Sequence, residues 1–229
     1  MNSVLTIEDL RFSWPGQDER VLDIERLSVA PGEKVFLHGP SGSGKSTLLA
    51  AIGALVVPQA GRVKLCGQDL SALSGGGRDR FRADHLGVIF QQFNLLPWLD
   101  VIANVTLPCR FSKSRAQRAG DVQQAARNLL EAMDLEDALW NRRADQLSVG
   151  QQQRVAAARA LIGQPDLVLA DEPTSSLDTD RRERFLDLLF GRLEAAGSAL
   201  LFVSHDRELA ARFDRSVELP EINRAGVRA

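Results

Sequence analysis

Two patterns of apolar residues along the chain predict two kinds of β-strand. Apolar and polar positions alternate at residues 4–10 and 21–29, and a short stretch at 62–65 lies between glycines. Alternation of period two is typical of half-buried strands, so we expect an antiparallel β layer near the N-terminus. Short, nearly continuous apolar runs are instead typical of strands that helices cover on both faces. Four such runs predict a mostly parallel sheet: 34–38, 86–90, 167–170 and 199–203.

Helical patterns dominate the middle of the chain. Residues 116–133 carry apolar side chains at a spacing near 3.6, and residues 155–162 are rich in Ala, Leu and Ile. We expect a single α/β domain over residues 1–229, with a helical subdomain at 92–163 inserted into a core formed by 1–91 and 164–219. The glycine triplet at 75–77 predicts a flexible loop, and residues 220–229 predict a loose tail.

Residues capable of chemistry follow each of the four apolar runs. In open α/β sheets, ligands bind beyond the carboxyl ends of the strands. We therefore expect a ligand site at that edge of the sheet. The residues that follow the runs are Gly39, Gln91, Asp171 with Glu172, and Ser204 with His205.

Residues 39–46 read GPSGSGKS, which fits the phosphate-loop pattern G-x-x-x-x-G-K-[ST]. A predicted strand precedes this segment and a helical run at 45–52 follows it, as the pattern requires. Glycines let backbone N–H groups converge on phosphates at a helix N-terminus. An ordinary Gly/Ser turn before a helix is the alternative, and the flanking elements make it the weaker interpretation. The expected nucleotide-binding residues are Gly39, Pro40, Ser41, Gly42, Ser43, Gly44, Lys45, Ser46 and Thr47.

Chemical roles follow from the residue types. Lys45 would reach the β- and γ-phosphates, the Ser46 hydroxyl would bind Mg²⁺, and Thr47 would reach the α-phosphate. Asp171 ends a buried strand and would hold Mg²⁺, while Glu172 would act as general base for the attacking water. A solvated Asp–Glu turn is the alternative, but it explains neither the phosphate loop nor the long apolar run before the pair.

Composition narrows the classes of protein further. Of 229 residues, 44% are hydrophobic and 25% charged, which is typical of an ordered globular protein. The 28 Lys and Arg against 30 Asp and Glu leave a net charge of −2, so we expect no nucleic-acid partner. No apolar run approaches the ~18 residues of a membrane span, which favours a cytoplasmic chain. Cys66 and Cys109 are interpreted as small buried or half-buried hydrophobes without a role.

The segment at residues 147–154 makes the chain resemble the ATP-binding subunits of ABC transporters. Residues 147–154 read LSVGQQQR and precede an alanine-rich helix, in the family's order between Gln91 and the Asp171–Glu172 pair. Ser148 and Gln151 also fit the capping box of an ordinary helix start, and both interpretations can hold. SSLD at 175–178 and His205 fit the same order, and the resemblance spans roughly residues 4–219. FQQFNLLP at 90–97 and NVTLP at 104–108 are similar to the lipoprotein-release and macrolide-export branch.

The resemblance implies an ATPase that uses ATP and Mg²⁺, and whose two copies close head to tail as a homodimer. Gln91 would sense Mg²⁺ and the attacking water, and Gln92 is the neighbouring alternative for that role. His205 would contact the γ-phosphate, and Asp178 would couple the two sites. Membrane-spanning permease subunits would be the partners, which places the chain on the inner face of the cell membrane. In the other copy's site the residues in contact with ATP would be Ser148, Gly150 and Gln151.

Two positions need separate interpretation. Val149 stands where the family has glycine, and a positive φ there would cost ~1 to 3 kcal/mol of strain. The family also places an aromatic residue against adenine after the first strand. Phe12 is expected in the core by alternation, so Trp14, beside a Pro-Gly turn, is expected to stack on the base.

Two other functions remain as alternatives. One is an ABC-type ATPase that regulates a membrane or cell-envelope complex, or acts in solution, without transport. The other is a binding module without hydrolysis, which the presence of Lys45, Glu172 and His205 argues against.

Overall fold

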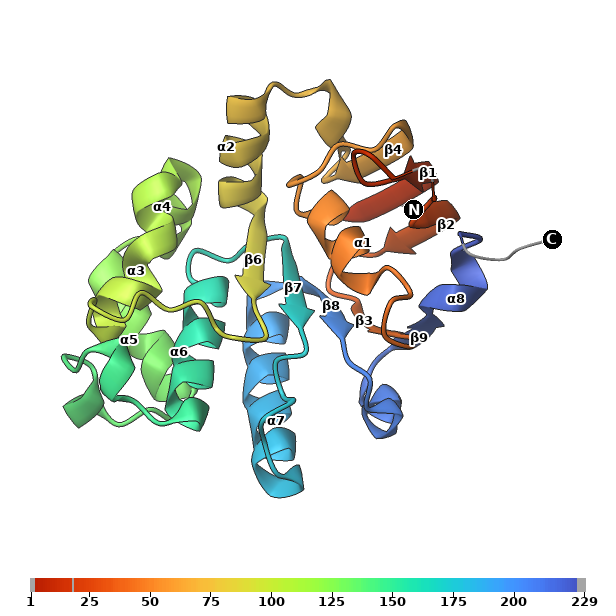
Figure 1. The fold of residues 1–229 in the computed structure, drawn as a ribbon. Helices are drawn as coiled ribbons and strands as arrows, with labels where there is room; N and C mark the ends of the chain where they lie inside the picture. Colours follow the sequence, from red (N-terminus) through yellow and green to blue (C-terminus); the bar gives the residue numbers. More distant parts are fainter. Residues whose placement is uncertain (1–2, 18, 226–229) are drawn as a thin grey trace. The chain divides into compact units, whose positions relative to one another are not determined.

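The structure is a computed structural model that describes residues 3–17 and 19–225 (Figure 1). Its contacts divide the chain into two compact units, which are described one at a time. The first unit comprises Met1–His85 and Ala199–Ala229, and the second comprises Leu86–Ser198.

An antiparallel sheet lies at the N-terminal end of the first unit, as the alternating pattern predicts. β1 (Leu5–Phe12) pairs antiparallel with β2 (Leu22–Val29) and with β4 (Ala60–Leu65), and the short β5 (Gln68–Asp69) pairs antiparallel with β4. Alternate side chains of β1 are buried and form one side of the core.

Three parallel strands complete the sheets of the first unit. β3 (Lys34–His38) lies between β8 (Ala199–Val203) and β9 (Arg215–Glu218), and it is parallel to both. The apolar residues of β3 and β8 are fully buried, which confirms the interpretation of these two runs as central strands. The unit's helices are α1 (Lys45–Ile52), α2 (Gly75–His85), α8 (Leu219–Ile222) and two short 3₁₀ turns, η1 (Leu70–Ala72) and η4 (Arg207–Arg212).

Two expectations for the first unit were wrong. The glycine triplet at 75–77 is not a loop but the first turn of α2, because Ser74 caps the helix by accepting the Gly77 N–H through Oγ at 3.2 Å. Residues 220–225 are not a loose tail, since Pro220 lies in α8 and Asn223 is buried. The rest of the expected tail, 226–229, lies outside the described residues.

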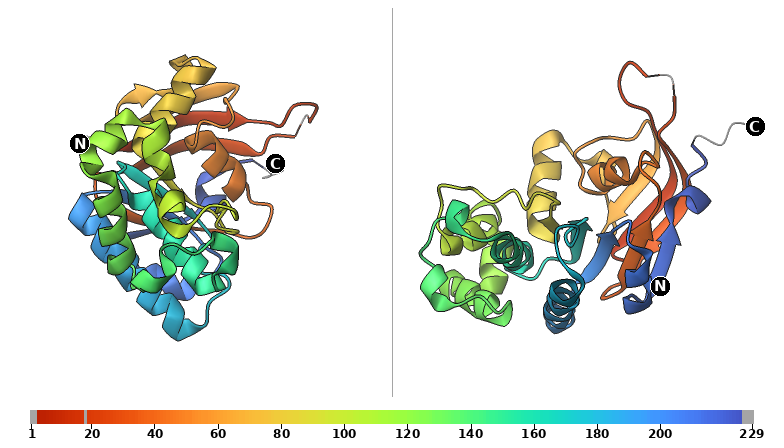
Figure 2. Two further views of the ribbon diagram at one scale, coloured as in Figure 1. Left: turned by 90° about the vertical axis from the view of Figure 1, so that its left-hand side faces the viewer. Right: turned by 60° about the horizontal axis from the view of Figure 1, so that its bottom comes forward.

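The second unit combines two parallel strands with a group of helices. β6 (Leu86–Ile89) pairs parallel with β7 (Leu167–Asp171). α3 (Val101–Phe111) packs against α4 (Lys113–Ala119), α5 (Val122–Ala132) and α6 (Val149–Leu161), and these four helices lie together in both views of Figure 2. α7 (Thr179–Ala196) follows β7, and two short 3₁₀ turns, η2 (Asp137–Leu139) and η3 (Ala144–Gln146), precede α6.

The predicted helix at 116–133 is two helices in the structure. Gly120 ends α4 with a positive φ of 66°, and the Asp121 carboxylate caps α5 by accepting the N–H groups of Gln123 and Gln124. A capping residue directly after a glycine is a strong local break signal, and the apolar spacing across it concealed the break.

A buried arginine anchors α4 inside the second unit. The Arg115 guanidinium donates hydrogen bonds to the backbone carbonyls of Leu86 at 3.1 Å, Ala160 at 2.7 Å and Ile162 at 2.7 Å. Two of these carbonyls close the C-terminal end of α6, where helix carbonyls have no partner within the helix. Arg115 therefore ties α4, α6 and β6 together.

Candidate functional site

The phosphate loop of the first unit connects β3 directly to α1, as the sequence predicts. Gly42 and Gly44 have φ values of 81° and 101°, which glycine adopts at little cost. Gly44 is also the N-cap of α1, and a Cβ there would lie 3.0 Å from Leu22 Cδ2 and 3.1 Å from the Val21 carbonyl oxygen. Backbone conformation and close packing therefore both require glycine at position 44.

Polar groups of the loop are arranged for an anion. Lys45 Nζ donates to the carbonyls of Gly39 at 2.8 Å and Pro40 at 2.9 Å, and an ammonium has a third proton to donate. Ser46 is exposed and Thr47 is buried. Among the described residues, the buried Ser43 Oγ makes no hydrogen bond. Lysine, helix N-terminus and hydroxyls together fit a phosphate group.

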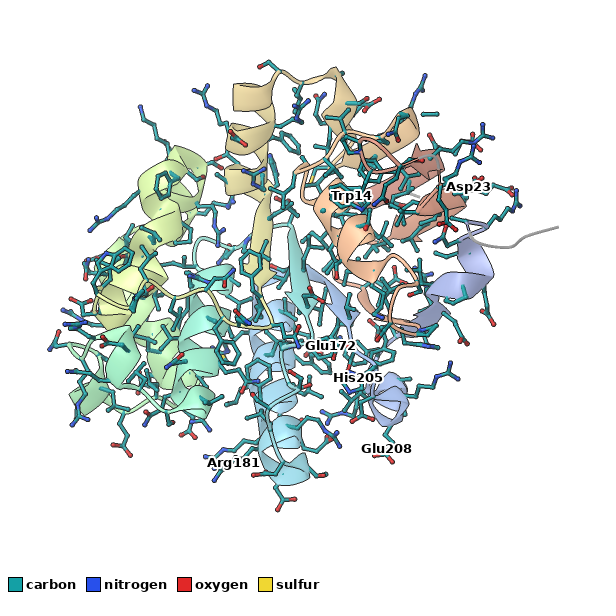
Figure 3. The ribbon with its side chains drawn as sticks, viewed as in Figure 1. Trp14, Asp23, Glu172, Arg181, His205 and Glu208 are labelled. Carbon is teal, nitrogen blue, oxygen red and sulfur yellow. The ribbon has the colours of Figure 1, made fainter. Side chains whose placement is uncertain are left out.

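His205 follows β8, at the same edge of the first unit's parallel sheet as the phosphate loop. β3 and β8 are adjacent parallel strands, with Leu37 opposite Val203, and the Ser204 N–H donates to the Leu37 carbonyl at 3.2 Å. The chain after β8 therefore leaves the sheet at the same edge as the loop. His205, labelled in Figure 3, is exposed there.

Trp14 lies beyond the end of β1 and is 38% exposed (Figure 3). Its ring packs edge-on against Phe12, with centroids 5.1 Å apart and planes at 85°. Phe12 is buried, as the alternation predicts. The buried Phe12 ring thus supports the Trp14 ring, and Trp14 has an exposed surface on which a base could stack.

We expect Trp14→Ala to weaken ATP binding about fivefold or more, since stacking on an aromatic ring contributes ~1 to 3 kcal/mol. Phe12→Ala should mainly lower the unfolding temperature, because Phe12 is buried. Calorimetric titration with ATP and thermal unfolding of both variants separate the two effects. Normal ATP binding by Trp14→Ala would assign the base contact to another side chain.

The carboxylate pair stands at the end of β7 in the second unit. Asp171 is the last residue of the strand, and Glu172, labelled in Figure 3, follows it with a φ of 46°. A positive φ at glutamate costs of order 1 kcal/mol, and such strain concentrates at functional sites. Gln153 of α6 holds the next turn by donating its side-chain amide to the Pro173 carbonyl at 2.8 Å. α6 and the strained turn are therefore directly connected.

Gln91 leaves the sheet of the second unit at the same edge as Asp171, because β6 and β7 are paired in parallel with Ile89 opposite Ala170. Gln91 is exposed, and Phe93 and Asn94 after it have φ values of 60° and 49°. Two consecutive non-glycine residues with φ values in the left-handed region mark a tightly constrained turn.

Arg159 of α6 holds this turn. Its guanidinium donates to the carbonyls of Phe93 at 2.5 Å and Asn94 at 2.7 Å. Burial lowers the pKa of Arg159 from its ordinary value. Asn104 of α3 fixes the next part of the segment, accepting the Leu96 N–H at 2.8 Å and donating to the Leu96 carbonyl at 3.1 Å. Sequence reasoning missed both residues, although an arginine within an alanine-rich helix was a visible signal.

The N-terminal end of α6 has the geometry that the sequence predicts for a capping box. Ser148 Oγ accepts the Gln151 N–H at 3.4 Å, and Gln151 Oε1 accepts the Ser148 N–H at 2.9 Å. Val149 is the first residue of α6 and does not have a positive φ, so the strain considered for it is absent. A Cβ on Gly150 would meet no atom within 4 Å. The chain's own packing does not require glycine there.

Asp178 and the cysteines complete the predicted residues. Asp178 is the N-cap of α7, since its carboxylate accepts the Arg181 N–H at 2.9 Å and pairs with the Arg181 guanidinium at 3.3 Å. Cys109 is half-buried, and burial raises the pKa of its thiol against the opposing charges of Arg115 and Arg118. Cys66 was expected to be buried or half-buried, but it is exposed because it lies in the turn after β4.

Two features define the class of P-loop nucleotide-binding proteins. One is a strand followed by a glycine-rich loop and a helix that starts with lysine, and the other is a pair of carboxylates after a parallel strand. Within this class, the family model described as "ABC transporter" matches residues 22–175. The chain belongs to this family, and its predicted membership is confirmed.

Relatives refine the assignment. The chain is 44% identical over 220 residues to the "Lipoprotein-releasing system ATP-binding protein LolD" of Novosphingobium aromaticivorans, covering 95% of this chain and 96% of that one. It is 41% identical over 205 residues to the "Macrolide export ATP-binding/permease protein MacB" of Chromobacterium violaceum, covering 89% of this chain and 31% of that one. The predicted branch is therefore confirmed.

A solved structure supports the fold and the activity. It is described as the dimeric structure of a post-hydrolysis state of the ATP-binding cassette MJ0796 bound to ADP and Pi, and it is 36% identical with a TM-score of 0.83 over 93% of both chains. The chain is an ATP-hydrolysing subunit of the ABC transporter family, as predicted. Within the described part of the chain, no helix combines the length and apolarity needed to cross a membrane.

Proposed function

We propose that two copies of the chain bind Mg²⁺ and ATP, close head to tail, and drive separate membrane-spanning permease subunits. The observation that carries the dimer is the start of α6. Its N-terminus is capped by Ser148, and Gly150 faces open space although glycine in a helix costs up to ~1 kcal/mol relative to alanine. A glycine that its own chain does not need suits the close approach of a group from another molecule.

Each candidate residue has a proposed role. Residues 39–47 hold the phosphates, with Lys45 on the β- and γ-phosphates, and Trp14 stacks on adenine. Glu172 accepts the proton of the attacking water, and His205 orients that water. In the other copy's site Ser148, Gly150 and Gln151 contact the γ-phosphate, and Asp178 couples the two sites.

Oxygen ligands are available for the metal. Mg²⁺ prefers hard oxygen donors in an octahedral arrangement and keeps several waters. Ser46 offers a hydroxyl, Gln91 a side-chain carbonyl and Asp171 a carboxylate, and all three lie next to a strand end or a helix start. This donor set fits Mg²⁺, which would neutralise charge on the phosphates. The residues that we assign to it are Ser46, Gln91 and Asp171.

The contact with the permease is assigned to residues 91–99. Trp98 in this segment is 65% exposed, whereas Phe93 is buried. Phe93 therefore anchors the segment, and Trp98 presents an apolar side chain at the surface. A large exposed apolar side chain on an ordered segment is typical of a contact surface. The relative named as an ATP-binding and permease protein supports a membrane partner. On this account the chain works at the inner face of the cell membrane, bound through its partner, and no nucleic acid is involved.

Cross-linking tests this contact. With Cys66 and Cys109 replaced by serine, a cysteine at position 98 should cross-link to a membrane-spanning protein, with a yield that changes when ATP is added. A cysteine at Gln123, which is exposed on α5, serves as the control and should not cross-link. Cross-links only to soluble proteins or nucleic acid would contradict the transporter function and favour a regulatory ATPase.

A charged residue at the same position tests the coupling itself. Trp98→Glu should leave ATP binding by the isolated chain within about twofold of the wild type, because the phosphate loop is unchanged. It should prevent copurification with the membrane partner, since a carboxylate would have to be buried in an apolar contact. A variant that still copurifies at the wild-type level would remove Trp98 from the contact.

A further inference from the structure

The C-terminal segment of residues 219–225, here named the C-terminal strap, packs against other elements of the first unit. α8 packs beside β2 and β9 (Figure 1). Asn223 forms an isolated antiparallel bridge with Ile24, and the Arg224 N–H donates to the Asp23 carbonyl at 2.8 Å. Asp23 is labelled on β2 in Figure 3. The end of the strap, at Asn223 and Arg224, thus pairs with β2.

Asn223 is only 4% exposed, and its side-chain amide uses its full hydrogen-bonding capacity. Nδ2 donates to the carbonyls of Val21 at 3.0 Å and Ser43 at 3.1 Å. Oδ1 accepts the N–H groups of Asp23 at 2.8 Å and Ala225 at 3.2 Å. Two carbonyls on one side and two N–H groups on the other leave a single orientation of the amide that satisfies all four.

One of these partners belongs to the phosphate loop. The Ser43 carbonyl and the Gly44 N–H share one planar trans peptide unit, in which the two groups point in opposite directions. A carbonyl of Ser43 held toward Asn223 therefore turns the Gly44 N–H away from the strap. Gly44 is the N-cap of α1, at the helix end where backbone N–H groups form the proposed phosphate site.

The strap also packs tightly on the loop. A Cβ on Gly44 would lie 3.5 Å from Asn223 Nδ2, and a Cβ on Gly39 would lie 3.1 Å from Pro220 Cδ and 3.6 Å from Leu219 Cβ. Residues at both ends of the loop therefore contact the strap, so the strap limits how far the loop can shift.

We propose that Asn223 is a positioning residue for nucleotide binding, which orients the Ser43–Gly44 peptide so that the Gly44 N–H faces the phosphates. It acts through the loop and does not touch the nucleotide. The inference rests on the proposed role of the loop in phosphate binding. It adds that the C-terminal strap, about 180 residues away in sequence, sets the affinity of that site.

Asn223→Asp tests the donor side of the amide. The aspartate keeps an acceptor for the Asp23 and Ala225 N–H groups, but it removes the donor to Ser43 and places a second acceptor opposite that carbonyl. KM for ATP and Kd for ADP should both rise about tenfold, while kcat at saturating ATP should change less than twofold. The measurements are steady-state phosphate release and calorimetric titration, at a temperature where circular dichroism shows the variant folded. Asn223→Ala should give the same split.

Arg224→Ala is the matched control. Its exposed guanidinium pairs with Glu25, and within the described residues it makes no hydrogen bond or ion pair with the loop, so KM and Kd should stay within twofold. Nucleotide affinity within twofold of the wild type in Asn223→Asp and Asn223→Ala would overturn the proposal. So would a kcat that falls as much as the affinity, or loss of a cooperative unfolding transition in both variants, which would show a structural role only. A wild-type chain that fails to bind ATP would instead contradict the proposed function.

Discussion

Replacing Glu172 with glutamine should lower ATP turnover by ~10² to 10⁴, because the variant loses the carboxylate that we propose as the general base of the reaction. Glutamine has nearly the same shape, so it can occupy the same backbone position with a φ of 46°. ATP affinity should be kept, since it depends on the phosphate loop. We expect an ATP-bound dimer to accumulate, and phosphate release together with analytical ultracentrifugation measures both effects.

Glu131→Gln is a control for the loss of one negative charge. Glu131 is exposed on α5, and its replacement should leave turnover unchanged. Turnover of Glu172→Gln near the wild-type rate would exclude Glu172 as the base. Loss of ATP binding together with turnover would show that the substitution had disturbed the site.

Arg115→Met should lower the free energy of unfolding by about 3 to 5 kcal/mol. Methionine fills part of the same volume, but it leaves three buried carbonyls without the donor that now serves them. Loss of one partner in a buried polar network is far more costly than loss of an exposed pair. Chemical denaturation followed by circular dichroism measures the change.

Arg127→Met provides the comparison. Arg127 is exposed on α5, and surface substitutions of this kind usually change stability by no more than about 0.5 kcal/mol. Equal stability losses in the two variants would show that the buried hydrogen bonds of Arg115 are not the cause.

Local patterns predicted the elements around the phosphate loop almost to the residue. The bounds of β3, α1 and β8 agree with the apolar runs, because each run is short and bounded by residues of different character. The capping box of Ser148 and Gln151 was equally readable, since its two residues lie three positions apart.

Contacts between distant parts of the chain could not be read in the same way. Arg159 and Asn94 are 65 positions apart, and Asn223 and Ser43 are 180 apart. Their partners are backbone carbonyls, which every residue has, so the sequence carries no complementary side chain to reveal the pairing. For this reason the sequence suggested a loose tail where the structure has the strap, since nothing in residues 219–225 points to the distant contact.

The most direct test of the central claim is the rate of phosphate release from Mg²⁺ and ATP by the purified chain over a range of protein concentrations. In the proposed dimer each site needs Ser148 and Gly150 of a second copy, so the rate should rise more steeply than the first power of concentration at the dilute end. Lys45→Ala should abolish it. Hydrolysis strictly proportional to protein concentration and retained in Lys45→Ala, or no hydrolysis at any concentration, would contradict an ATPase that closes around the nucleotide.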